Sequence, residues 1–259
     1  MESFSLLIVG VSGCSFLIFQ WLFHRGIPWV SACLSSGFSR LDHKQRIEWN
    51  TRAVSTFHAV MVGLFCLYIF LFDEATKEDP IWGDPTLVQL NVGITTGYLL
   101  SDMLLMFYYW TSIGEKYFVI HHLAALYAYY FVLSQGMLPY FANFRLLSEL
   151  STPFVNQRWF FKVLGYYKLS KPNVVNGVAM AAVFFLVRIA VIPVYYGDMY
   201  SVYGTDAFCR LSVAGCIAWI LSSLCLDVMN VMWMSRIIRG CLKVLQSSRC
   251  VKAKTKQKN

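Results

Sequence analysis

The sequence predicts an all-α, polytopic membrane protein with about seven transmembrane helices. Hydrophobic residues make up 57% of the 259-residue chain and charged residues only 14%, whereas an ordinary soluble domain carries roughly 25% charged residues. The mean hydropathy is +0.52. Apolar runs of the length that a spanning helix needs, about 20 residues, follow one another along the chain.

The first predicted span covers residues 4–23. It begins with Glu2 instead of a basic segment and lacks a small-residue cleavage site, which favours a retained helix over a signal peptide. Four further runs reach span length: 53–72, 87–110, 174–196 and 211–235.

The region between residues 116 and 161 predicts two more spans. The first covers about 116–134. The second runs from Pro139 to about Phe161 and is expected to kink at Pro153, because proline removes a backbone donor and clashes with the preceding turn. These two spans bring the predicted total to seven.

The connecting segments alternate in charge. Segments 24–52 and 158–172 are basic, whereas segments 73–86 and 197–210 are not. Lysine and arginine concentrate in cytoplasmic loops, so we expect a lumenal or extracellular N-terminus and a cytosolic C-terminus.

The net charge of +8 is concentrated at the C-terminus, where residues 236–259 contain Lys and Arg but no acid. We expect residues 244–259 to be a disordered cytosolic tail that contacts anionic lipid headgroups. Nucleic acid is not an expected partner, because the chain has no basic, aromatic domain outside the membrane. Nothing in the sequence indicates a protein partner.

Ionisable residues interrupt the predicted spans. A charged side chain within a span costs roughly 2.5–3.5 kcal/mol on insertion scales, so these side chains should turn inward, pair with one another or meet water in a cavity. They are His58, Asp102, His121, His122, Arg145, Glu149, Arg188 and Asp227.

Most of these residues also have a purely structural interpretation. Arg145 and Glu149 are four residues apart and can pair along one helix face. Asp102 and Asp227 can each hydrogen-bond a neighbouring helix, with Arg188 as the counter-charge of one of them. A single histidine on an apolar face, such as His58, is more typical of a helix-bundle core than of a catalyst.

The adjacent histidines in "YFVIHHLAALYAYYF" (117–131) are more informative. Successive helical residues point about 100° apart, so His121 and His122 cannot both face lipid, and at least one should open to a cavity. A neutral imidazole can accept a proton near pH 7, and a second can orient it or donate to an oxyanion. Histidine can also be acylated. Two adjacent histidines chelate metal poorly, so no metal site is expected.

The sequence resembles the TLC-domain family, which includes ceramide synthases, translocon-associated membrane proteins and lipid-homeostasis proteins, and is most like its small stand-alone members. The likeness runs from Arg46 to Lys243. It rests on "RIEWNTRAVSTFHAV" (46–60), "GYLLSD" (97–102), "IHHLAAL" (120–126), "LLSELSTPFVNQRWF" (146–160) and "NG" (176–177). The resemblance implies three parts: a leading helix and basic loop (1–45), a TLC domain (46–243) and the tail.

The same resemblance implies that six helices close around a cavity for a lipid chain. His121 and His122 match the family's histidine pair, which is the acyl-transfer centre in ceramide synthases, and Asp102 matches an acidic position in the preceding span. Tyr98 and Asn156 lie in the matching segments and join the ionisable residues as candidates for substrate binding.

One segment departs from the ceramide synthase pattern. Those enzymes follow their histidine pair with an aspartate-rich "HDxSD"-like segment, whereas this chain reads "NFRLLSELSTPFVNQ" (143–157), with Glu149 as its only acid. The departure points away from ceramide synthesis and leaves another acyl transfer open.

Two functions therefore follow as hypotheses. The first is an intramembrane acyltransferase of lipid homeostasis that needs no cofactor and uses an acyl-CoA or lipid donor. The second is a non-catalytic protein that binds, senses or traffics lipid in the same cavity. The resemblance favours the endoplasmic reticulum membrane for either.

Overall fold

The computed structural model describes residues 2–256, with side chains described for residues 6–244 and 246. Within this range every regular element is a helix, which confirms the all-α fold class. Six helical segments of the described chain are long and apolar enough to cross a membrane. They are Leu6–Leu34, His43–Phe72, Thr86–Tyr108, Lys116–Gln135, Lys171–Val202 and Val213–Val244.

A seventh passage is made by a broken helix. It consists of α8 (Pro139–Leu146), a 3₁₀ segment (Leu147–Ser151) and α9 (Thr152–Val163), without an intervening loop. The break falls just before Pro153, at the place where the sequence predicts a kink, because proline disfavours the α conformation in the residue that precedes it.

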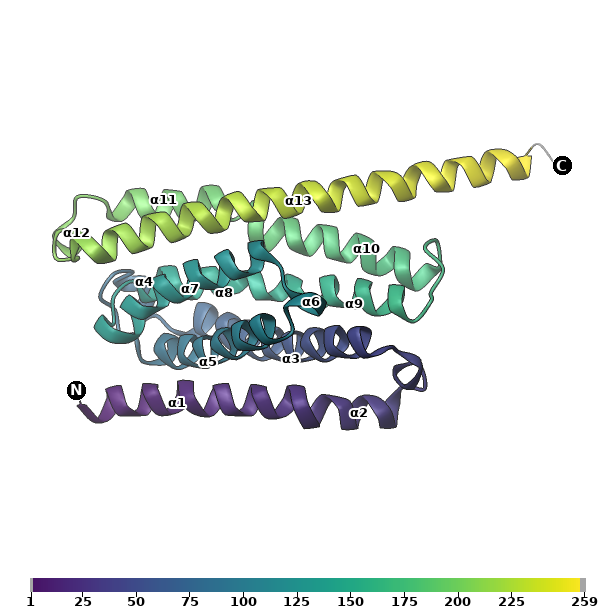
Figure 1. Ribbon diagram of the computed structural model, residues 1–259. Helices are drawn as coiled ribbons and strands as arrows, with labels where there is room; N and C mark the ends of the chain where they lie inside the picture. Colours follow the sequence, from purple (N-terminus) through teal and green to yellow (C-terminus); the bar gives the residue numbers. More distant parts are fainter. Residues whose placement is uncertain (1, 257–259) are drawn as a thin grey trace.

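The broken helix runs the length of the bundle beside α3 (His43–Phe72). Asn143 donates to the carbonyl of Cys66, in the last turns of α3, whereas Asn156 donates to the carbonyl of Arg52, in its first turns. The chain therefore makes seven passages that alternate in direction, and its two ends lie at opposite ends of the bundle (Figure 1).

The first passage is longer than predicted. Helix α1 (Glu2–Trp21) continues through a π-helical turn (Leu22–Gly26) into α2 (Ile27–Leu34). Helix α3 also starts ten residues before the predicted residue 53, because Asp42 and Gln45 form a capping box at its N-terminus. The predicted basic loop 24–52 is thereby reduced to residues 35–42.

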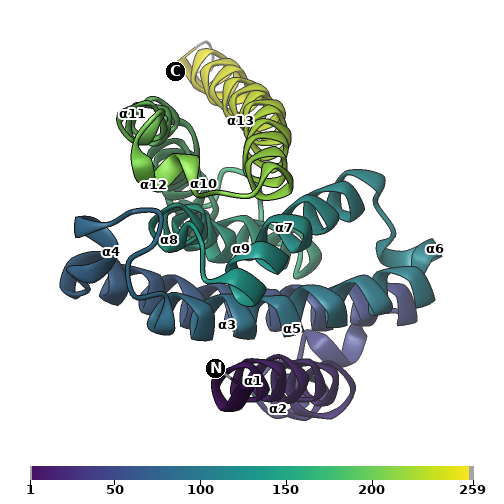
Figure 2. The same cartoon turned by 90° about the vertical axis from the view of Figure 1, so that its left-hand side faces the viewer.

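Helix α1 packs along α5 (Thr86–Tyr108) on the outside of the bundle. The two backbones meet at Gly97, where a Cβ atom would collide with the carbonyl oxygen of Ser12. Ser15 seals the contact by donating to the carbonyl of Ile94 at 2.7 Å. Viewed along the helices, α1 and α2 lie beyond α3 and α5, on the side away from α13 (Figure 2).

The remaining helices complete the bundle. A π-helical turn (Phe185–Ile189) joins α10 to α11, and Gly136 ends α7 with a φ of 66°, a left-handed conformation that suits glycine. The bounds are α4 (Ala75–Glu78), α6 (Trp110–Ile113), α7 (Lys116–Gln135), α10 (Lys171–Phe184), α11 (Ile192–Val202), α12 (Asp206–Cys209) and α13 (Val213–Lys256).

Helix α13 differs from the expectation of a disordered tail over 244–259. It continues to Lys256 and extends past the neighbouring helices (Figure 1). Lysine, which recurs at residues 252, 254 and 256, is a good helix former. Residues 257–259 of the predicted tail lie outside the described residues.

The two ends of the bundle differ in charge. The end with the loops 35–42 and 164–170 and the last part of α13 carries Arg40, Lys168 and Arg239, whereas the opposite end carries Asp73, Glu74 and other acids around α4 (Figure 1). Basic and acidic segments that alternate along the sequence therefore lie at opposite ends of the bundle.

Candidate functional site

A cavity of about 330 Å³ lies inside the bundle. The residues that line it come from α3, α5, α6, α7, the 3₁₀ segment Leu147–Ser151, α9, α10, the π-helical turn Phe185–Ile189 and α13, and no described side chain of α1 is among them. Six passages therefore surround a cavity while the leading helix packs outside, as the resemblance implies. The volume is at the lower end of the range for ligand sites, about 300–1,000 Å³.

Both histidines of the pair line this cavity. Nδ1 of His122 lies 2.7 Å from the carbonyl oxygen of Phe118, and a carbonyl can only accept, so Nδ1 carries a hydrogen. Nε2 of the same ring lies 3.1 Å from Oδ2 of Asp102. The carbonyl contact thus turns Nε2 toward the carboxylate, and these two atoms share the site of a proton.

His121 has different surroundings. Its ring packs edge-on against Trp233, with 5.4 Å between the centroids, and lies 5.9 Å from the ring of His122. Its Nδ1 is enclosed and has no hydrogen-bond partner in the described chain. The two neighbouring imidazoles are therefore held by different groups and are not chemically equivalent.

Glu149 and Arg188 also line the cavity. Arg188 is only 7% exposed and donates to Oγ of Ser151 at 2.9 Å and to Oδ1 of Asn230 at 3.0 Å. Glu149 accepts from Thr152 at 3.2 Å. Within the described chain neither charge has an oppositely charged partner at ion-pair distance, so both are available to a ligand.

Arg145 and Asp227 are not part of the cavity wall. They form a bidentate ion pair with N–O distances of 2.5 and 3.0 Å. The Arg145 guanidinium lies 3.8 Å from the ring centroid of Tyr195. We call Arg145, Asp227, Tyr195, Trp219 and Ser223 the closed network.

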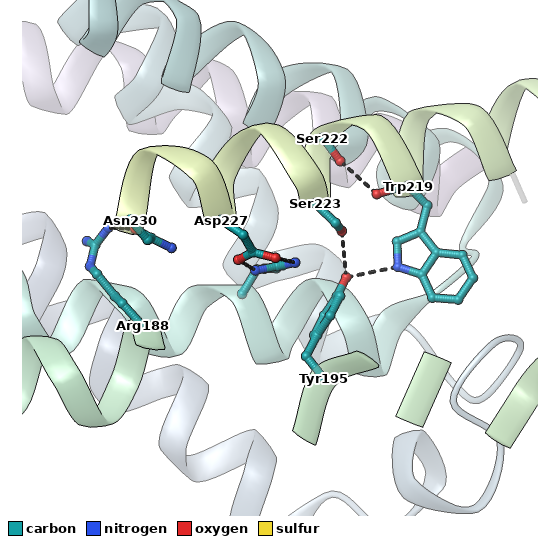
Figure 3. Close-up of polar contacts among 8 residues, drawn as sticks. Arg188, Tyr195, Trp219, Ser222, Ser223, Asp227 and Asn230 are labelled. Atoms are coloured by element: carbon teal, nitrogen blue, oxygen red, sulfur yellow. Dashed lines mark hydrogen bonds and ion pairs between the residues drawn. The ribbon is translucent and has the colours of Figure 1, made fainter. Parts of the chain in front are cut away.

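The closed network is completed by hydroxyl and indole groups. Trp219 donates to the Tyr195 hydroxyl at 2.9 Å, and that hydroxyl lies 3.0 Å from Oγ of Ser223. Figure 3 shows Tyr195 between Trp219 and Ser223, with Asp227 farther along α13 and Arg188 beside Asn230. Polar side chains of α13 thus contact first the closed network and then, farther along the helix, Arg188.

Two predicted pairings do not form. Arg145 pairs with Asp227 instead of Glu149, because the 3₁₀ segment turns by about 120° per residue where an α-helix turns by about 100°, so Glu149 leaves the face that Arg145 occupies. Arg188 bonds two neutral side chains and is not the counter-charge of Asp102 or Asp227.

His58 lies behind the cavity wall. It is 1% exposed, and its ring stacks on Tyr98 with 3.9 Å between the centroids. Neither of its nitrogens has a hydrogen-bond partner among the described residues. Tyr98 itself lines the cavity, so His58 is placed to support that wall and not to touch a ligand.

Asn156 lines the cavity on the side of the basic end of the bundle. Its amide donates to the carbonyl of Arg52 and to Oγ1 of Thr56, and its oxygen accepts from the Arg52 guanidinium at 3.2 Å. Arg52 also bonds Glu48, four residues earlier, at 2.8 Å.

Several cavity residues are absent from the sequence-based candidates. Those with side chains that can form hydrogen bonds are Glu48, Thr51, Arg52, Ser55, Thr152, Trp233 and Arg236. The Glu48–Arg52 spacing of four was a usable signal for a helix-surface pair. Nothing in the local sequence around Trp233 indicates that it packs on His121.

This arrangement supplies the groups that acyl transfer needs. The Asp102–His122 pair can accept a proton, and Arg188 can stabilise negative charge. Apolar side chains of the wall, including Leu99, Met180 and Phe184, suit a hydrocarbon chain.

Comparison with known proteins identifies the family. The TLC domain matches residues 48–239. The chain belongs to the TLC-domain family. The resemblance seen in the sequence is thereby confirmed, and the matched region lies within the predicted domain 46–243.

Three TLC-domain relatives cover nearly the whole chain. TLC domain-containing protein 4-B of Xenopus laevis is 61% identical over 95% of this chain and 94% of its own length. Human TLC domain-containing protein 4 is 54% identical over 100% of this chain and 98% of its own. TLC domain-containing protein 4-B of Danio rerio is 54% identical over 89% of this chain and 88% of its own. No solved structure matches.

Proposed function

We propose that this TLC-domain protein holds an acyl lipid in its cavity and transfers the acyl group to a lipid acceptor. The observation that carries the proposal is the contact between His122 and Asp102 at the wall of the 330 Å³ cavity. It joins a proton-accepting pair of fixed orientation to a space whose surface is mostly apolar. Acyl transfer requires a base and a water-poor site for the chain.

The proposed reaction balances without a redox partner. The Asp102–His122 pair accepts the proton of an amine or hydroxyl acceptor as the acceptor atom attacks the carbonyl carbon of a thioester or ester donor. The bond from that carbon to the leaving sulfur or oxygen then breaks, and the leaving group takes the proton from this pair. Arg188 stabilises the negative charge on the carbonyl oxygen or on a nearby lipid headgroup.

The test combines acyl-donor turnover with native mass spectrometry of the protein purified in lipid nanodiscs. We expect the wild type to retain a lipid and to consume a long-chain acyl thioester. His122→Ala should lower turnover by about 100–10,000-fold, the usual range for loss of a general base. His43→Ala, at an exposed position at the start of α3, is the matched control.

The same experiment separates the second candidate function, which is non-catalytic lipid binding, sensing or trafficking. One observation favours it: Glu149 is the single acid of the segment that follows the histidine pair. An intact lipid retained equally by wild type and His122→Ala, with no turnover of thioester or ester donors, would replace the first function with the second.

The charge separation supports a membrane orientation. The basic end of the bundle faces the cytosol, in line with the positive-inside rule, and we place the protein in the endoplasmic reticulum membrane. Arg52 and Arg236, which line the cavity, then lie on its cytosolic side, where a soluble thioester donor is available. Basic residues beyond Arg236 contact anionic headgroups on that side. Protease protection of tags at the two termini tests the orientation.

A further inference from the structure

A second, much smaller void lies between the cavity and the closed network. Its volume is about 20 Å³, and its wall includes His121, Arg145, Ser148, Arg188 and Asn230. A space of roughly 10–15 Å³ is sufficient for one water molecule. The void is thus large enough for one water and too small for a lipid group.

Two polar atoms at this void lack partners. Nδ1 of His121 and Nε of Arg145 are both enclosed, and neither makes a hydrogen bond within the described chain. Burying an unsatisfied polar group costs about 1–3 kcal/mol, and more for a charged group. A single bridging molecule that accepts from Arg145 and reaches His121 satisfies both atoms at once.

We propose that this void is a water-binding site that connects His121 to the Arg145–Asp227 ion pair. The water oxygen accepts from Nε of Arg145, and one water hydrogen is donated to Nδ1 of His121. Ser148 and Asn230 add further hydrogen-bonding groups to the wall, which brings the site to the two to four polar partners that a buried water requires.

The charges around the void select the direction of the hydrogen bond. The guanidinium groups of Arg145 and Arg188 both line it, and two cations turn the hydrogens of a water away from themselves. A lone pair on Nδ1 of His121 receives such a hydrogen, whereas an N–H at Nδ1 would direct its own positive end toward the cations. The neutral ring of His121 therefore carries its hydrogen on Nε2.

This assignment gives the two histidines opposite hydrogen positions. His122 carries a hydrogen on Nδ1, because it contacts the Phe118 carbonyl, and its Nε2 faces Asp102 in the proton-accepting pair. His121 carries its hydrogen on Nε2 and acts as a donor. Arg145 and Asp227 are positioning residues for His121. The catalytic part of this division rests on the proposed function, but the hydrogen positions do not.

The experiment is ¹⁵N NMR of the full chain with ¹⁵N-labelled histidine in nanodiscs. The shifts of the two ring nitrogens report which one carries the hydrogen. His121→Gln and His122→Gln identify the two signals. We expect the Nε2–H form for at least nine-tenths of His121 and an Nδ1–H signal for His122. An Nδ1–H form of His121 in the wild type overturns the proposal.

Two variants test the water bridge itself. Ser148→Val adds bulk at the wall of the void, and Arg145→Gln/Asp227→Asn removes the ion pair without leaving one charge buried alone. Both should reduce the Nε2–H preference of His121 by at least threefold and leave the His122 signal unchanged. Asp102→Asn should change the His122 signal and leave the Nε2–H preference of His121 unchanged.

Unfolding temperatures identify any variant that fails to fold, so that a lost signal is not read as a changed tautomer. A folded Ser148→Val protein and a folded double variant that both keep the wild-type His121 signal would refute the bridge. A lack of acyl turnover would contradict the proposed function and leave the tautomer result intact, so the two ideas fail separately.

Discussion

The cavity and the closed network both bury charged side chains within the membrane, but the network pairs its charges, whereas Arg188 and Glu149 of the cavity have no ion-pair partner among the described residues. In the network Arg145 meets both carboxylate oxygens of Asp227 and lies over Tyr195. In the cavity Arg188 bonds only neutral groups, and Glu149 accepts from a hydroxyl. The two regions are neighbours, since Arg188 and Asn230 lie one or two helical turns from Tyr195 and Asp227 (Figure 3).

The paired charges Arg145 and Asp227 hold helices together, whereas the unpaired charges Arg188 and Glu149 are open to a ligand. A buried pair with complete hydrogen bonding fixes the position of its helices, and breaking it is costly because one charge is left alone. A buried charge without a counter-charge is tolerated where a cavity lets a ligand or water reach it. We therefore expect the network to control stability and the cavity to control ligand binding.

The largest expected effect is on stability, from Arg145→Ala. This change leaves Asp227 buried without a partner and should destabilise the protein by about 3–5 kcal/mol, measured as denaturant or thermal unfolding in nanodiscs. Arg145→Leu/Asp227→Leu should recover most of that loss. Equal stability of wild type and Arg145→Ala would mean that the network is not a structural element.

An intermediate effect is expected on ligand affinity, from Arg188→Gln. Loss of charge-assisted hydrogen bonds worth about 1.5–3 kcal/mol should weaken oleate binding by about 10–100-fold, measured by titration in nanodiscs. The unfolding temperature should change far less than in Arg145→Ala. Arg188→Lys keeps the charge without the planar guanidinium. Its oleate affinity should therefore lie between those of the wild type and Arg188→Gln. Unchanged oleate affinity in Arg188→Gln would remove Arg188 from the ligand site.

The smallest expected effect is that of Tyr195→Phe. Removing the hydroxyl leaves Trp219 Nε1 without its acceptor and Ser223 without its partner, whereas the contact of the ring with Arg145 is kept. We expect a loss of about 1–2 kcal/mol in unfolding free energy and unchanged oleate affinity. A change in affinity without a change in stability would show that the network extends into the ligand site.

The sequence was most informative where a signal is carried by composition or by neighbouring residues. The spans 87–110 and 116–134 nearly coincide with α5 and α7, and the predicted kink at Pro153 falls at the 3₁₀ segment. It was least informative at helix starts, since the capping box of Asp42 is a side-chain arrangement and the π-helical turn before Pro28 interrupts no apolar pattern.

The candidate residues also divide into those that the sequence marked as inward-facing and those that only the structure could assign to the cavity or away from it. The histidines and Asp102 are polar residues at places where lipid does not tolerate them, so the sequence alone marked them as inward-facing. It did not separate Glu149, which lines the cavity, from Arg145, which does not. That separation depends on the 3₁₀ turn between them and on where Asp227 lies, eighty-two residues later in the chain.

By itself the sequence determined the membrane setting, the number of passages and the family, because hydropathy and local motifs are properties of short segments. Only the tertiary structure decided which buried charges pair with one another and which face the cavity. Partners such as Arg145 with Asp227, or His121 with Trp233, come from helices distant in sequence. Small rotations at a 3₁₀ or π-helical turn decide which of these side chains meet.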